Sequence, residues 1–293
     1  MTTLPIGRPL AGHALATTPR LRAPWHWTLA GGVLGLALTL LLFAPARWMA
    51  WAVEHASDGR LRLEAPQGTV WNGSAQPVLT GGDGSHDAAA WPSRVVWRLR
   101  PTIAEVTQDA GRPTLAPTLA PAFDLALSAD CCTRAPLAIT VSWTPGATHV
   151  ALADGPVSHW PAGLLTGLGT PWNTLAPEGQ LELRTQGLRL QWMQQRLRVS
   201  GRAELTVRDA ATRLTPLRPV GSYRLTVEGG ALPDLRLETL QGGLQLSGSG
   251  QWVGERLRFT GEARAQPGTE AALDNVLNII GRRDGSRALI TMG

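Results

Sequence analysis

The chain has 293 residues, 43% of them hydrophobic, so it is long enough and apolar enough to bury a core. Its 33 glycines and 22 prolines stay below the ~25–30% share that favours disorder, and with few aromatic residues besides tryptophan they favour a turn-rich β protein. All 27 basic residues are arginines, the net charge is only +5, and arginines alternate with acidic residues, which argues against a nucleic-acid surface with clustered cations.

The first predicted element is a segment without formal charge at residues 23–46. As a helix it measures ~36 Å, and the hydrocarbon core of a bilayer is ~30 Å thick. Trp25 and Trp27 precede its most apolar part, and Trp48 and Trp51 follow it. Tryptophan favours the headgroup region of membranes, so this arrangement predicts one membrane-spanning helix.

Charges that flank the span indicate its orientation. Only arginines precede it, whereas arginines and acidic residues are mixed after it, and the two sides carry similar numbers of basic residues. The acid-free N-terminus favours a cytoplasmic location. We therefore predict a cytoplasmic tail at residues 1–24, a transmembrane anchor at 25–52 and a periplasmic β-rich domain at 53–293.

A cleaved signal peptide is the alternative interpretation of the same segment. The sequence Ala44-Pro45-Ala46 loosely resembles a small-x-small cleavage site, although proline is unusual in its middle. Tryptophans on both flanks and the length of the apolar segment favour the uncleaved anchor.

Beyond Leu61 the dominant pattern is a period of two, which is typical of half-buried strands. Glycine or proline clusters separate many of the runs, and helical patterns do not intervene. We predict an all-β fold, a curved antiparallel sheet in the periplasm, accompanied by the N-terminal transmembrane helix and a short amphipathic C-terminal helix. The clearest alternating runs lie at residues 61–63, 95–99, 137–143, 188–192, 197–199, 205–207, 223–227, 235–237, 244–246 and 257–259.

Three stretches interrupt this pattern. Residues 80–90 are rich in glycine, aspartate and alanine, and residues 113–121 are rich in proline, alanine and threonine, so both are predicted loops. The weakly charged region 155–175 is expected to hold a short helix at residues 161–168.

The C-terminal helix has the most complete signals. Thr269 is its predicted cap, Glu270 lies in the first turn, and Gly281 is its predicted stop. We expect the helix to cover an edge or open end of the sheet, with a partner-binding helix as the alternative. Its apolar stripe comprises Leu273, Val276, Leu277 and Ile280.

Catalytic and metal-binding motifs do not emerge from the sequence. The histidines lack zinc-binding spacing, and there is no GxSxG, Walker A or post-strand GxGxxG motif. We expect no catalytic residues, no metal and no cofactor. Cys131 and Cys132 are adjacent, so a vicinal disulfide is chemically allowed in the periplasm but strained, and neighbouring strand residues point to opposite faces. The pair alone offers too few ligands for a metal.

Several segments resemble one known family. The sequence GTVWNGSA at residues 68–75, soon after the anchor, is similar to the signature of type II secretion system protein N, also called general secretion pathway protein N. Each motif is weak alone, but their order is specific, and the resemblance covers most of the chain after the anchor, with the stretch around residues 113–121 unmatched. Further similar blocks lie at residues 91–100, 169–173, 214–223, 246–252 and 261–283.

The resemblance implies an inner-membrane accessory component of the machine that exports folded proteins from the periplasm, and it carries no catalytic residues. We expect a non-catalytic scaffold or adaptor that contacts other type II secretion proteins and inner-membrane lipids, without nucleic acid or a small-molecule substrate. Trp71 is interpreted as a packing residue rather than a partner contact. The candidate partner or structural residues are Gly68, Trp71, Gly73, Trp97, Leu273 and Leu277.

Two other functions compete with the scaffold. A lipid-handling protein would use the apolar face of a curved sheet, and a continuous open groove of Leu, Val and Trp would favour it over a filled core. An envelope hydrolase would need a base and a nucleophile that converge in one pocket.

Overall fold

The computed structural model describes residues 25–82, 87–106, 118–193, 196–230, 232–253 and 256–293. The chain forms two compact units, Met1–Phe43 and Ala44–Gly293. In the described part of the first unit, a single helix, α1 (Trp25–Leu42), is long and apolar enough to cross a membrane. Its 18 residues carry no charge and measure ~27 Å, close to the hydrocarbon thickness.

The second unit begins with another helix, α2 (Ala46–Ala56), which follows α1 after three residues. The predicted anchor at residues 25–52 therefore covers α1 and about half of α2. The limits of the cytoplasmic, membrane and periplasmic parts stay predictions.

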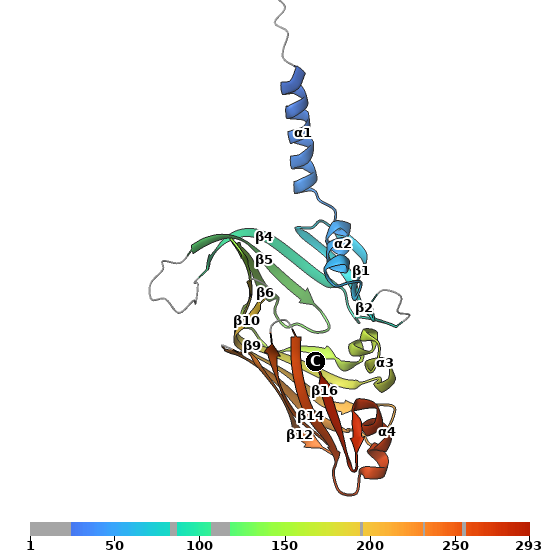
Figure 1. Cartoon of the computed structure of the whole chain (residues 1–293). Coiled ribbons are helices and arrows are strands. Elements are labelled where there is room, and N and C mark those ends of the chain that lie inside the picture. Colours follow the sequence, from blue (N-terminus) through green and yellow to red (C-terminus); the bar gives the residue numbers. More distant parts are fainter. Residues whose placement is uncertain (1–24, 83–86, 107–117, 194–195, 231, 254–255) are drawn as a thin grey trace, which may run out of the picture. The chain divides into compact units, whose positions relative to one another are not determined.

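Apart from its helices, the second unit forms one antiparallel sheet, which confirms the predicted fold class (Figure 1). The strand path is β1-β2-β4-β5-β6-β7-β9-β10-β11-β12-β13-β14-β16-β15, with β3 added to β2 and β8 added to β9. The strands are β1 (Leu61–Gly68), β2 (Asn72–Thr80), β3 (Ala88–Ala90), β4 (Val95–Val106), β5 (Thr118–Ala129), β6 (Leu137–Thr144), β7 (Ala147–Leu152), β8 (Ser158–Pro161), β9 (Glu178–Met193), β10 (Arg196–Ala211), β11 (Gly221–Gly230), β12 (Asp234–Gly242), β13 (Leu244–Val253), β14 (Arg256–Ala265), β15 (Arg282–Asp284) and β16 (Arg287–Met292).

Alternation along the strands separates two faces. Leu205, on β10, pairs with Leu183 and Leu225 on the neighbouring strands, whereas the adjacent Glu204 lies on the opposite face. Ion pairs connect strands on that charged face, where Arg224 lies 3.1 Å from Glu204. Exposed pairs of this kind stabilise by only ~0–1 kcal/mol, so their main effect is to keep this face in water.

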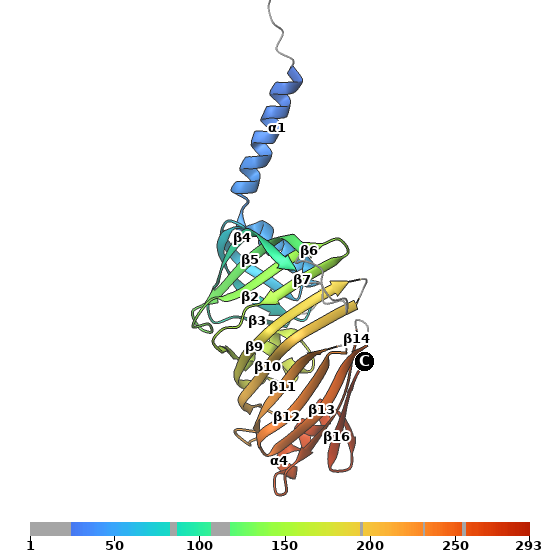
Figure 2. The ribbon, with the colours of Figure 1, turned by 90° about the vertical axis from the view of Figure 1, so that its left-hand side faces the viewer.

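The helices of the second unit lie on one side of the sheet. They are α2, the 3₁₀ helix η1 (Ala162–Leu168), α3 (Trp172–Leu175) and α4 (Glu270–Ile280). In Figure 1, α3 and α4 stand to the right of β12 and β14, while α2 lies against β1 and β2; in Figure 2 the helices lie behind the strands. The helix expected at residues 161–168 is thus present as η1.

Both predicted loops proved partly wrong. Within 80–90, Ala88–Ala90 form β3, because Ala90 pairs with Val78 of β2; residues 83–86 lie outside the described part. Within 113–121, residues 118–121 open β5, and 113–117 lie outside the described part. Pro121 is tolerated because the ladder to β6 starts only at Ala122, so β5 is paired on one side there.

The terminal helix begins after Thr269 as predicted, but Thr269 does not cap it with its side chain. Its hydroxyl donates to the carbonyl of Gln266 at 2.8 Å, so it does not accept from a helix N–H. Instead, the Glu270 carboxylate accepts from the N–H of Gly268 at 2.7 Å. Gly281 ends the helix in extended conformation, where a Cβ would lie 2.5 Å from the carbonyl oxygen of Leu289.

Candidate functional site

The family-like segment at residues 68–75 forms the turn between β1 and β2. Gly68 has φ +83°, a left-handed conformation that favours glycine. The N–H of Thr69 donates to the carbonyl of Asn72 at 2.9 Å and closes the turn. The N–H of Val70 donates to the carbonyl of Ala44, also at 2.9 Å. The turn therefore holds the chain just before α2.

Trp97 is the central side chain of this region. It is only 3% exposed, packs with Ala46 and Ala75, and donates its Nε1–H to the carbonyl of Val70 at 3.0 Å. Gly73 makes room for the ring, because a Cβ there would lie 2.5 Å from Cζ2 of Trp97. We call this arrangement of Ala44–Ala46, residues 68–75 and Trp97 the α2 clamp. Its partly buried neighbours are Met49, Leu63, Leu125 and Leu127.

Four of the candidate residues, Gly68, Trp71, Gly73 and Trp97, thus lie in the α2 clamp. Trp71 is half-buried at its margin, with its ring centroid 6.1 Å from that of Phe123. Its carbonyl accepts from the N–H of Leu99 at 2.7 Å. Trp71 therefore packs on the sheet while part of its ring remains accessible.

The outer side of α2 is rich in aromatic residues. Trp48 and Trp51 are 47% and 62% exposed, and the ring of Trp51 lies 4.2 Å from that of His55. These residues share one face of the helix, because they are three and four positions apart. The α2 clamp holds the opposite side, where Ala46 is buried.

The sheet side that carries the helices continues beyond the α2 clamp as two rows of mainly apolar side chains, which we call the apolar face. The first row crosses six strands from β4 to β10 through Pro101, Phe123, Val141, Val150, Leu190 and Val199. The second row, on β6, β7, β9 and β10, consists of Trp143, Thr148, Trp192 and Leu197.

The apolar face becomes more exposed with distance from α2. On β4, exposure rises from 3% at Trp97 to 69% at Ile103, two positions past Pro101. Trp143 and Trp192 are each 41% exposed. Most other members of the two rows are half-buried. This part of the sheet is therefore an open apolar surface rather than a filled core.

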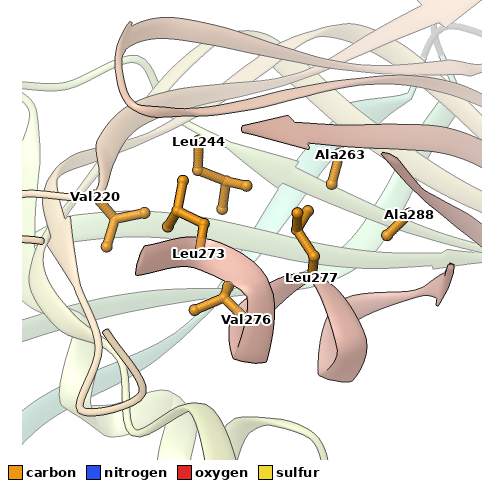
Figure 3. Packing of buried hydrophobic residues seen from close by; sticks show 7 residues of the cluster. All are labelled: Val220, Leu244, Ala263, Leu273, Val276, Leu277 and Ala288. Carbon is orange, nitrogen blue, oxygen red and sulfur yellow. The ribbon is translucent and has the colours of Figure 1, made fainter. Parts of the chain in front are cut away.

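The C-terminal candidates lie in a separate buried cluster between α4 and the sheet (Figure 3). Leu273 and Leu277 are 0% and 2% exposed, as expected for a helix stripe that covers the sheet. Their partners are Val220, Val276, Leu244, Ala263 and Ala288. The outward side chains of α4, such as Asp274 and Asn278, are exposed and polar.

The cysteine pair lies in the turn after β5. The structure joins Cys131 and Cys132 through their sulfur atoms, with Cys132 buried and Cys131 exposed. The N–H of Cys132 donates to Ala129, and its carbonyl accepts from His159, each at 2.8–2.9 Å. The pair therefore lies in a turn, where the rule that neighbouring strand residues point to opposite faces does not apply.

A charged group beside the cysteines brings a histidine and a carboxylate together. His159 Nε2 lies 3.8 Å from Glu182 Oε1, and the same oxygen accepts from Arg208 at 2.7 Å. Ser158, next to His159, points to the other face of β8, where its Oγ accepts from Trp160. These residues therefore do not form a nucleophile–base pair. In the described part of the chain, no group of three metal-ligating side chains comes together.

A depression of about 880 Å³ lies on the charged face around His149, lined also by Arg189 and Arg198. Burial lowers the pKa of His149 below its usual 6.5, and Nε2 lies 3.0 Å from the Thr144 hydroxyl. Well above pH 6.5 the imidazole is neutral in both the folded and the unfolded chain. As the pH falls below 6.5, the unfolded chain binds the proton first, so the free energy of unfolding decreases as the pH decreases.

We therefore expect the protein to lose more thermal stability between pH 7.5 and 5.5 than its His149→Gln variant does. Thermal unfolding of the detergent-solubilised full chain at both pH values measures the difference. An equal loss in both proteins would show that His149 does not contribute to this pH dependence.

Together these features define a class: antiparallel β proteins preceded by one helix that is long and apolar enough to cross a membrane. The family model for type II secretion system protein N matches residues 59–290, so the chain belongs to this family, which confirms the resemblance of its motifs. Membership gives it a role in type II secretion and is consistent with a single-pass inner-membrane protein. No curated protein and no solved structure matches the chain.

Sequence reasoning named the parts of the α2 clamp that belong to the sheet but missed those that belong to α2. Ala44 and Ala46 carry no recognisable signal, and their role appears only through contacts with Val70 and Trp97. The apolar face was missed as a unit, although alternation at residues 137–143 and 188–192 had already indicated two of its strands.

Proposed function

We propose that the chain is a non-catalytic accessory component of the type II secretion system, acting as a scaffold or adaptor in the inner membrane. The observation that carries this proposal is the extent of the family match. Residues 59–290 cover the strands from β1 nearly to the end of β16, so the shared feature is the whole sheet rather than a pocket.

The proposed topology has α1 in the inner membrane, residues 1–24 in the cytoplasm and the sheet in the periplasm. The acid-free segment before α1 supports this orientation, and the tryptophans around α1 and on α2 support the membrane span itself. A C-terminal reporter that is active only in the periplasm tests the orientation.

Contacts with other secretion proteins are proposed at loops and at the polar side of α4. Both ends of the sheet are poorly suited to strand addition. The edge strand β15 has three residues, all exposed, and two of them are arginines. The other edge strand, β1, is interrupted by a register shift between Glu64 and Gln67. Partners that bind by adding a strand are therefore disfavoured.

The test is co-purification of the tagged full chain from membranes of its own host, with a tagged chain reduced to residues 1–43 as control. Other type II secretion proteins are expected with the full chain and not with the control. If none is recovered and deletion of the gene leaves secretion intact, the scaffold proposal is wrong. If a folded His159→Gln variant abolishes secretion, the non-catalytic part is wrong.

A further inference from the structure

We propose that the apolar face binds acyl chains of membrane phospholipids. This binding goes beyond a scaffold role, because it gives the sheet a ligand of its own. The two rows of the apolar face contain a single hydroxyl side chain, Thr148, and the residues beside them in sequence, such as Asp124, His149 and Arg198, point to the opposite face. Glu105, near the far end of β4, lies on the same side but outside the rows.

The apolar face is open to solvent. Phe123 and Trp143 touch edge to face, with ring centroids 5.8 Å apart, yet Trp143 remains 41% exposed. Two buried clusters, one under α2 and one under α4, leave the rows between them open. Large exposed apolar surfaces are uncommon in soluble domains unless they bind something.

The length of the first row also fits an acyl chain. The first row crosses β4, β5, β6, β7, β9 and β10. Five spacings of ~4.8 Å give a length of ~24 Å. One leaflet contributes ~15 Å to the ~30 Å hydrocarbon thickness. The row is therefore long enough for an extended acyl chain.

Position and chemistry favour lipid over a protein partner. The apolar face starts at α2, which follows α1 after three residues in the sequence and exposes Trp48 and Trp51. Tryptophan prefers the headgroup region, so α2 suits the boundary from which acyl chains would come. Protein interfaces have about one hydrogen bond per 100–200 Å², and the two rows offer only one hydroxyl and the indole N–H groups of Trp143 and Trp192. Acyl chains need none.

The test uses the full chain in liposomes of phosphatidylethanolamine and phosphatidylglycerol, with a trace of phosphatidylethanolamine that carries a diazirine on one acyl chain. After irradiation, labelled peptides are mapped by mass spectrometry. Label in α1 serves as the internal standard, because that helix is expected to contact acyl chains in any case. The proposal expects additional label in peptides from β5, β6 and β9.

Neighbouring positions on β9 provide a matched pair of variants. Trp192 belongs to the apolar face, whereas Gln191 points to the opposite face. Trp192→Glu should reduce sheet label relative to α1 label by about ten-fold or more, since each ~1.4 kcal/mol lost is a factor of ten and a buried carboxylate loses more. Gln191→Glu should leave the ratio unchanged. Melting temperatures show whether both variants remain folded.

Three results would overturn the proposal. One is label confined to α1 and α2 in the unchanged chain. Another is a dimer, seen by light scattering, that Trp192→Glu dissociates, because the apolar face would then be covered by a second copy. The third is a Trp192→Glu variant that keeps its label but loses other secretion proteins on co-purification. If the unchanged chain is labelled on the sheet but recovers no other secretion proteins on co-purification, only the scaffold role is refuted.

Discussion

Replacing Leu277 with aspartate is expected to melt the second unit far below the temperature of the unchanged protein. Leu277 is 2% exposed and packs from α4 onto the sheet. Truncating a buried leucine alone costs ~2–5 kcal/mol, and a carboxylate adds a desolvation cost that this apolar site cannot offset. At ~2–4 °C per kcal/mol for a domain of this size, the melting temperature should fall by roughly 10 °C or more.

The matched control is Asn278→Asp, which adds the same charge at the next, exposed position of α4. It should leave the melting temperature nearly unchanged. Thermal unfolding of the detergent-solubilised full chain, followed by circular dichroism, makes the comparison. If Leu277→Asp keeps its melting temperature but loses secretion or co-purification, α4 is a docking surface and its burial against the sheet is not what matters.

The fold was predictable where one face of a strand is apolar and the other is charged. On β11, Leu225 and Val227 alternate with Arg224 and Glu228, and the structure places the two sets on opposite faces. A one-residue slip would bury the charges, so this alternation determines both strand type and register. The α4 stripe was predictable for the same reason with a period of 3.6.

Prediction failed where contacts distant in sequence decide the structure. Thr118–Pro121 resemble a loop by composition, yet they pair with residues 103–106 of β4. The local sequence does not reveal this partner strand. α2 has no signal of its own in the sequence, because its tryptophans equally suit a membrane boundary. Its separate identity depends on Ala46 packing against Trp97, which lies about fifty positions away. The apolar face likewise emerges only when the strands are assembled in order.

Trp97→Ala is expected to be the second severe change, because it removes the centre of the α2 clamp. Burial of a large aromatic residue is typically worth ~3–5 kcal/mol on truncation to alanine. The carbonyl of Val70 also loses the Nε1–H donor. α2 should come loose from β1 and β2, so protease cleavage near residues 44–56 should accelerate along with the drop in melting temperature.

The control for lost aromatic volume is Trp192→Ala, a tryptophan of the same sheet that is 41% exposed and should cost much less. Gly73→Ala tests the contact between Gly73 and Trp97 in the α2 clamp, because the added Cβ would lie 2.5 Å from the Trp97 ring. Such overpacking costs ~1–3 kcal/mol. In the Trp97→Ala background the contact with the ring disappears, while the approaches of 2.8 Å to the carbonyl oxygens of Gln67 and Thr69 remain. The two changes together should therefore destabilise less than their sum. Strict additivity would mean that Gly73 serves only the turn and that the ring is held without it.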